Sequence, residues 1–420
     1  MFSVEFPRRR ALLLSAAASS FAMIASGAAI AQETSCESRE TMHFDLPANI
    51  DTVQQGFFSP SLEPLLTVNS GDFVTIEMAT HHADKDPRMM DGDEGIESIF
   101  AERTSGHILT GPIAVCGAEP GDILEVRILD LYPRASQHPD AVGRAFGANV
   151  ATGGGFLDNP LVATEIEDGD RALTIYEVDA TGVRPWARAD YSYPVGGNPE
   201  DRTETVLEGV RVPIRPHIGI LAVTPNDSER VISGPPAYFG GNVDDWRIGK
   251  GATMYYPVAT PGALLVAGDP HAAQGDSELS GTAIELSLTG TLQLILHKEA
   301  DTSGTILAGL TYPLLETADE FVIHGFSFPN YLQELGSSPE EAQELMYESS
   351  SLDQAMYDAA SKMMDFLTGP MGLTYNEAYS LMSVAIDFGV TQVVDGNWGI
   401  HATLRKDMMG EVDVLGTYLD

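Results

Sequence analysis

Short apolar segments separated by glycine and proline turns constrain the fold of this chain more than any other feature. They run from about residue 41 to residue 298 and alternate apolar with polar side chains, which is typical of strands with one buried face. The turn Ser70-Gly71-Asp72 opens one such segment at 73–78, and Pro120-Gly121-Asp122 opens another at 123–131. Many short strands of this kind predict a mainly β protein with a β-sandwich or jelly-roll-like body.

We place this body at residues 32–310. Within it, apolar residues at 283–288 and 292–297 flank Thr289-Gly290, and this pattern predicts a hairpin. Residues 153–208 are rich in Gly, Pro, Asp and Arg and lack a clear period. We expect them to form long connections with room for a short helix.

Residues 311–420 change to helical periodicity and predict an α+β portion that completes the same fold. Ser338, followed by Pro339 and Glu341, is typical of a capping box at a helix start. A second helix is expected to end at Gly369-Pro370, with an apolar face made of Leu352, Met356, Ala359, Met363 and Leu367. Thr374 caps a third helix, and residues 392–395 and 399–402 predict a final strand pair.

The first 31 residues are typical of a cleaved export signal. Arg8-Arg9-Arg10 precede an apolar run through Ile30, and Ala29-Ile30-Ala31 forms a small-residue cleavage site. The run is too short and too rich in small residues for a stable membrane span. Paired arginines favour twin-arginine export to the periplasm, with an ordinary secretory signal as the alternative. We expect no membrane association after cleavage.

The net charge of the chain limits its possible binding partners. The chain has 61 acidic and 23 basic residues, a formal net charge of −38, so phosphate backbones and anionic lipids are repelled and nucleic-acid binding is excluded.

The two cysteines of the chain are Cys36 and Cys116. An oxidising periplasm permits a disulfide between them, but the apolar setting of Cys116 favours a buried free thiol.

Polar residues that could do chemistry gather between residues 240 and 285, in turns that follow apolar strands. Asp269 and His271 stand two apart, so in an extended segment both point to one face. With Asp244 and Glu285 arriving from other strands, they would form a divalent-metal site with open positions. The alternative is that Asp269 and His271 are simple hydrogen-bonded turn residues.

A second candidate is the adjacent pair His81 and His82, at the end of an expected strand. Neighbouring side chains in a strand point to opposite faces, so at most one of the two is expected to enter a given site. The spacing leaves open which one does. The alternative is one exposed histidine and one packed histidine.

Taken together, these segments resemble the acetamidase/formamidase family. The resemblance spans nearly all of the chain after the signal, in family order. The matching runs are His107-Ile108-Leu109-Thr110-Gly111-Pro112-Ile113, Gly117-Ala118-Glu119-Pro120-Gly121-Asp122, Arg215-Pro216-His217-Ile218-Gly219, Gly240-Gly241-Asn242-Val243-Asp244, Gly268-Asp269-Pro270-His271-Ala272-Ala273-Gln274-Gly275-Asp276, Gly281-Thr282-Ala283-Ile284-Glu285, Glu377-Ala378-Tyr379 and Gln392-Val393-Val394-Asp395.

The resemblance implies a jelly-roll-like β fold with an α+β C-terminal portion, a homo-oligomer, and hydrolysis of short linear amides to a carboxylate and ammonia. It also implies that the active-site rim includes Asn242, Asp244, Asp269, His271 and Glu285. Two departures stand out, because many members have a glycine where this chain has Ser277 and a cysteine where it has Ser280. A thiol nucleophile is therefore not available at that point.

We therefore expect a metal-dependent amidase of formamide-like or acetamide-like substrates, with zinc as the first choice of metal and calcium as the second. A divalent cation can polarise an amide carbonyl and activate water. In this hypothesis the metal ligands are Asp244, Asp269, His271 and His82. Glu285 is the general base, with Glu278 as its substitute. The alternative from another class is a periplasmic small-molecule-binding protein that keeps the scaffold without catalysis.

Overall fold

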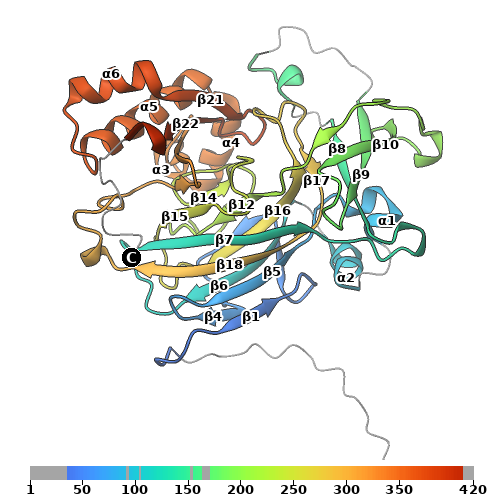
Figure 1. Cartoon of the computed structure of the whole chain (residues 1–420), viewed down its shortest axis with the longest axis horizontal. Helices are drawn as coiled ribbons and strands as arrows, with labels where there is room; N and C mark the ends of the chain where they lie inside the picture. The colour runs from blue at the N-terminus through green and yellow to red at the C-terminus, as the bar shows by residue number, and fades with distance from the viewer. Residues whose placement is uncertain (1–35, 91–93, 104–105, 152–154, 163–170, 410–420) are drawn as a thin grey trace, which may run out of the picture. The chain divides into compact units, whose positions relative to one another are not determined.

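The computed structural model is built mainly from β-strands, as the alternating sequence predicts (Figure 1). It describes residues 36–90, 94–103, 106–151, 155–162 and 171–409. The predicted export signal at residues 1–31 lies outside these ranges. Among the helices in the described ranges, none has the length and apolar character needed to cross a bilayer.

One sheet of nine strands joins the body to the C-terminal portion. All its neighbouring pairs are antiparallel except β1 with β5. The last four strands of this sheet come from residues 311–420, so the C-terminal portion extends the same sheet. Its order is β1 (His43–Leu46), β5 (Phe73–Met78), β18 (Leu288–His297), β7 (Ile123–Pro133), β15 (Thr253–Pro257), β19 (Leu314–Glu316), β20 (Glu320–Phe326), β22 (Gly399–Arg405) and β21 (Asp387–Gln392).

A second sheet of eleven strands carries most of the polar residues singled out above. Its main path is β11 (Val212–Pro213), β10 (Trp186–Pro194), β9 (Ala172–Asp179), β8 (Arg144–Val150), β17 (Ile284–Glu285), β16 (Leu265–Ala273), β12 (His217–Ala222) and β14 (Gly240–Asn242). Off this path, β6 (Ile108–Val115) pairs with β16, β2 (Val53–Gln55) and β4 (Leu66–Val68). A separate pair joins β3 (Phe57–Phe58) to β13 (Val231–Ile232).

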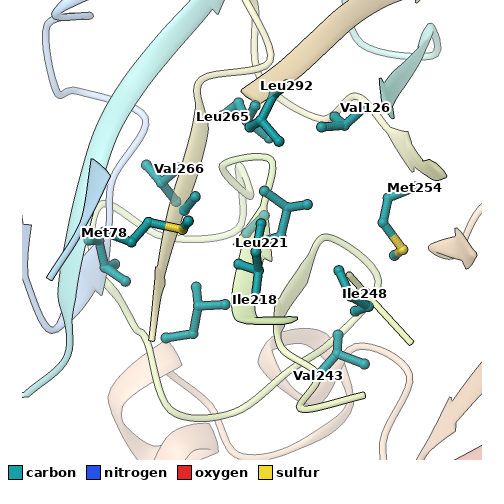
Figure 2. Close-up of a cluster of buried hydrophobic side chains, with 14 of the residues drawn as sticks. Met78, Val126, Ile218, Leu221, Val243, Ile248, Met254, Leu265, Val266 and Leu292 are labelled. Atoms are coloured by element: carbon teal, nitrogen blue, oxygen red, sulfur yellow. The ribbon is translucent and has the colours of Figure 1, made fainter. Parts of the chain in front are cut away.

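The main core lies between these two sheets, which makes the body a sandwich. Figure 2 shows apolar side chains of the first sheet, such as Met78 and Leu292, converging on Ile218 and Leu221 of the second. In β5 burial alternates along the strand, whereas every residue of β12 and β16 is buried. Strands β12 and β16 are therefore covered on both faces, and polar groups placed there are shielded from bulk water.

The helices of the C-terminal portion begin where the sequence predicts. Ser338 caps α4 (Pro339–Ser349) through Glu341 N, while the Glu341 carboxylate bonds to Ser337 instead of closing the capping box. Thr374 caps α6 (Tyr375–Ala385) with a complete capping box. The described helices also include α1 (Pro87–Met90), α2 (Glu94–Glu102), α3 (Tyr331–Glu334) and α5 (Leu352–Thr368), with 3-10 turns at Ala83–Lys85, Pro139–Ala141, Phe156–Asp158, Pro199–Asp201, Glu299–Asp301 and Lys406–Met409.

Helix α5 ends before Gly369 as predicted and packs on β20 and β22, beside α6 (Figure 1). Gly325 on β20 allows this contact, because a Cβ there would lie 2.1 Å from the backbone nitrogen of Ala359. Ala359, Met363 and Leu367 are buried, as the helical spacing predicts. Met356 was expected on the same face but is 40% exposed.

Two local predictions were wrong, and a third placed one strand a few residues too late. The expected hairpin at Thr289-Gly290 lies inside one continuous strand, β18, which is held on both sides by β5 and β7. The segment expected to form long connections contains the antiparallel strands β9 and β10. The predicted final strand pair is present, because β21 pairs with β22, but its first strand is Asp387–Gln392 and residues 393–395 form a bend after it.

The two cysteines form a disulfide, which corrects the expectation of a free thiol. Cys116 does not lie in a buried strand. It follows the end of β6 in a turn and is only half-buried, so Cys36 can reach it. Arg39 adds a second attachment of this N-terminal segment, through a bidentate ion pair with the buried Asp72.

Candidate metal and active site

Strand β16, at the centre of the second sheet, carries two of the predicted site residues, Asp269 and His271 (Figure 1). The sequence placed them in a turn at a strand end, but they lie inside the strand, where β12 and β17 cover both edges. The register pairs His271 directly with Glu285 of β17. Asp244 follows β14, and Glu278 lies in the turn after β16.

These side chains meet in one buried cluster. His271 Nε2 lies 3.2 Å from Asp269 Oδ2 and 3.2 Å from Glu285 Oε1. His271 Nδ1 lies 3.8 Å from Asp244 Oδ1. Ligand atoms of Glu278 lie within 4.8 Å of those of Asp244 and His271. The structure therefore brings together Asp244, Asp269, His271, Glu278 and Glu285, all of which the sequence had singled out.

Of the adjacent histidine pair, His81 faces the cluster. Its Nδ1 lies 3.2 Å from Asp269 Oδ1 and 3.9 Å from Glu285 Oε2. His82 stacks against His81, with ring centroids 4.0 Å apart, at the start of a 3-10 turn. His82 is not among the residues whose ligand atoms converge in the described part of the chain, so the geometry gives His81 the position expected of His82.

His107, which the sequence did not single out as a site residue, also faces Asp269. Its Nε2 lies 4.0 Å from Asp269 Oδ2. A 2.9 Å hydrogen bond between its Nδ1 and Ser233 Oγ holds the ring in this orientation. The only sequence signal was its place at the head of the run 107–113, directly before a strand.

His217 and Gln274 fix the orientation of His271. Gln274 Nε2 donates to the Asp244 carbonyl at 2.6 Å, so its Oε1 is an acceptor 3.2 Å from His271 Nδ1. Burial lowers the pKa of His217 to about 4. His217 is therefore neutral; its Nδ1 lies 2.7 Å from the Arg215 carbonyl oxygen, and its Nε2 lies 2.9 Å from Gln274 Oε1 and 3.1 Å from His271 Nδ1. His271 thus carries a proton on Nδ1, and its Nε2 is directed at the carboxylates of Asp269 and Glu285.

The backbone around the cluster has little tolerance for change. A Cβ on Gly219 of β12 would lie 2.5 Å from Asp244 Oδ1 and 2.8 Å from His271 Cε1, so only glycine fits there. Asp244 and Asp269 both adopt left-handed conformations, with φ of 51° and 50°. Such conformations cost free energy in residues other than glycine and are common at functional sites.

Asp395, in the turn after β21, brings a further carboxyl group from the C-terminal portion. It lies close enough to Asp244 that repulsion between the two carboxyl groups helps to raise the pKa of Asp244. Asn242 is 2% exposed, and no hydrogen bond to its Oδ1 is present in the structure. This contact between two carboxyl groups means that Asp244 is linked to the final strands as well as to β14.

Several buried polar atoms of the cluster lack a hydrogen-bond partner. They are His81 Nδ1, both carboxylate oxygens of Asp244, Asp269 Oδ1, His271 Nε2 and Glu285 Oε2. Buried polar groups are normally paired, and these lone pairs and charges converge on shared space. Three overlapping sets of these residues could each hold a metal ion: His81–His107–Asp269, Asp269–His271–Glu285 and Asp244–His271–Glu278. The residues therefore fit a divalent cation.

The pKa shifts agree with this electrostatic picture. Burial raises the pKa of Asp244 and of Glu278 well above their ordinary values. Repulsion from Asp395 adds to the shift of the Asp244 pKa, and repulsion from Asp244 adds to the shift of the Glu278 pKa. Burial alone would also raise the pKa of Asp269, but His271 and His107 outweigh it and hold that pKa well below its usual range. Burial opposes a charge on His271, whereas Glu285 and Asp269 raise its pKa. A metal ion would compete with that proton for Nε2.

A pocket of about 480 Å³ opens beside the cluster. Gln274 and Glu278 line it, so Glu278 belongs both to the pocket wall and to the buried cluster. Lys250 lies on the surface, where it pairs with Asp130 at 2.8 Å.

The β-sandwich holds histidines and carboxylates in a buried cluster beside an open pocket, which is the arrangement of a small-molecule site that could hold a metal ion. The model of the acetamidase/formamidase family matches residues 47–232 and 227–405 of this chain. The chain belongs to that family.

The curated relatives align with only part of this chain, and the aligned part spans less than two thirds of their own length. A putative formamidase of Schizosaccharomyces pombe is 30% identical over 270 residues, which span 56% of this chain and 64% of that protein. An acetamidase of Mycolicibacterium smegmatis is 32% identical over 41% of this chain and 49% of its own length. The crystal structure of a Bacillus halodurans acetamidase is 25% identical, with a TM-score of 0.62 over 88% of this chain and all of that one. A Yersinia enterocolitica acetamidase, 23% identical, has a TM-score of 0.65 over 89% of this chain and 94% of that one and supports the same fold.

Proposed function

We propose that this protein is a metal-dependent amidase that hydrolyses the C–N bond of linear amides to a carboxylate and ammonia. One observation carries the proposal: buried, unpartnered donor atoms of His81, Asp269, His271 and Glu285 converge beside a pocket that Glu278 also lines. Family membership and the names of the relatives, acetamidase and formamidase, support the substrate class.

In this proposal Asp269, His271 and Glu285 hold the metal, with His81 and His107 beside them. The mixture of imidazole and carboxylate favours zinc over calcium, because calcium prefers ligand sets made only of oxygen. A divalent cation bound there would polarise the amide carbonyl and lower the pKa of an attacking water. The backbone carbonyl of Asp244 accepts a hydrogen bond from Gln274, and Asp244 Oδ1 lies 3.8 Å from His271 Nδ1. Asp244 therefore supports the Nδ1 side of the His271 ring.

Glu278 is the best-placed group for proton transfer. It takes a proton from the attacking water and delivers it to the departing nitrogen as the C–N bond breaks, so that one water and one amide give a carboxylic acid and ammonia. The sequence suggested Glu285 as the general base and Glu278 as its substitute, whereas here Glu278 is the base and Glu285 is a metal ligand. The reason is that Glu278 lines the pocket, whereas Glu285 is 1% exposed and accepts a hydrogen bond from Ala283 N at 3.0 Å.

Removal of the metal tests the proposal. Protein that has been treated with a chelator, and from which the chelator has then been removed, should no longer release ammonia from formamide and acetamide. One equivalent of Zn²⁺ should restore this activity. Metal content is measured in the same samples by plasma mass spectrometry. Full activity in a sample shown to be metal-free contradicts the mechanism. A non-catalytic binding protein would bind amides and release no ammonia under any metal.

We further propose that the protein is exported and works in the periplasm. The disulfide between Cys36 and Cys116 supports an oxidising compartment. The protein recovered from a periplasmic fraction should begin at Gln32 by mass spectrometry and show no free thiol under denaturing conditions. Recovery only from the cytoplasm, with residue 1 retained and both thiols free, would argue against export.

A further inference from the structure

The pocket beside the cluster is much larger than a short amide requires. Its volume of about 480 Å³ lies within the range of roughly 300–1,000 Å³ in which proteins bind drug-sized ligands. Apolar side chains make up much of the wall of this pocket, among them Tyr176, Val212, Leu279 and Ile284. A formyl or acetyl group would leave this wall in contact with water.

The loop that carries Leu279 is held in place before any substrate arrives. Its start, Ser277, bonds to the backbone of Thr391 and Val393, and Phe156 N donates to the Leu279 carbonyl at 2.8 Å. Ser277 and Glu278 both adopt positive φ values of 85° and 47°, which fix a sharp bend. Leu279 nevertheless remains 51% exposed. A large apolar side chain held in the open on a fixed loop is suited to contact a ligand.

The part of the wall that follows Leu279 is also held by hydrogen bonds. Asn149 Nδ2 donates to the carbonyls of Thr282 and Ala283 at 2.8 and 3.2 Å and reaches Ser280 Oγ at 3.1 Å. Ser280 occupies the position at which many family members have a cysteine, and here its hydroxyl accepts the hydrogen bond from Asn149 that holds this part of the wall. The pocket is therefore formed in advance, with an apolar side and with Glu278 at its inner edge.

We propose that the substrates are amides of longer, apolar carboxylic acids, and that Leu279 sets this preference by packing against the acyl chain. The inference rests on the proposed amidase function, because Glu278 connects the pocket to the reacting cluster. Contact with the acyl chain brings the carbonyl carbon next to that cluster. In a hydrophobic pocket each buried methylene improves kcat/KM by about 10-fold or more.

The test compares kcat/KM for acetamide and hexanamide. The wild-type protein loaded with zinc should favour hexanamide by at least about 10-fold. The variant Leu279→Trp fills the pocket, and the ratio of hexanamide to acetamide should then fall by about 10-fold or more. The matched control is Leu129→Trp. Leu129 is a leucine of similar exposure, at 42%, on β7 outside the pocket lining, and its replacement should leave the ratio at the wild-type value.

A binding measurement separates this inference from the proposed function. Hexanoate and acetate, the products, are titrated calorimetrically into the zinc-loaded protein. Hexanoate should bind at least about 10-fold more tightly, and Leu279→Trp should remove the difference. Equal binding of the two acids, or an unchanged hexanamide ratio in Leu279→Trp, overturns the pocket assignment. Absence of ammonia release from every amide, combined with tight hexanoate binding, would instead overturn the amidase function and keep the pocket as a ligand site.

Discussion

Replacing Asp269 with asparagine is expected to abolish metal binding and, with it, amidase activity. Asp269 is the carboxylate on which His81, His107 and His271 converge. Replacing a residue that only supports a metal ligand already lowers metal affinity by about 10- to 100-fold. The loss of Asp269 should therefore lower the affinity by more than about 100-fold. Activity should fall to the level of protein without metal.

Asparagine is the right replacement because the backbone must stay unchanged. Asp269 has a φ of 50°, and asparagine tolerates this left-handed conformation better than other residues do. Metal content and thermal unfolding are measured together. The control is Asp130→Asn, which removes an exposed carboxylate that pairs only at the surface with Lys250. A folded Asp269→Asn variant that retains stoichiometric zinc would remove Asp269 from the metal site.

Replacing Glu278 with glutamine is expected to give the second largest effect, a loss of kcat with the metal retained. Glutamine keeps the size and shape of the side chain but cannot accept a proton from water. Positioned proton transfer typically contributes about 100- to 10,000-fold to a rate, so kcat should fall by that amount. Zinc content should remain at the wild-type level, because the proposed ligands are unchanged.

The informative comparison is Glu285→Gln. Glu285 is proposed as a ligand through its place opposite His271 at 3.2 Å, so this variant should lower zinc affinity, and excess zinc should restore part of its activity. Excess zinc should not restore Glu278→Gln. If Glu285→Gln keeps its metal and loses kcat while Glu278→Gln remains active, the roles are those that the sequence first suggested.

Much of the fold could be predicted from local pattern. The strand of residues 73–78 and the start of the helix after Thr374 depend on alternation, turn residues and caps that lie within a few positions of one another. The prediction of a hairpin at Thr289-Gly290 was wrong because β5 and β7 together hold β18 extended through the glycine. Pairing with distant strands outweighs a local turn preference of this kind.

The composition of the site could be predicted in part. Asp244, Asp269, His271, Glu278 and Glu285 were recognised because they recur in polar runs between apolar strands. Asp395 was not assigned, because its contact with Asp244 joins residues far apart in the sequence. The choice between His81 and His82 depends on how the chain leaves β5, which no spacing rule defines.

The sequence alone thus determined the β architecture, the class of metal-ligating residues and the family resemblance, because each is written in side-chain types and short spacings. Only the tertiary structure decided which atoms face one another. Burial of β16 on both faces turned an apparent polar turn into the centre of the site, and the disulfide was possible because the fold brings Cys36 to the end of β6. Roles at a site depend on distances of a few ångströms, and those arise when distant strands pack together.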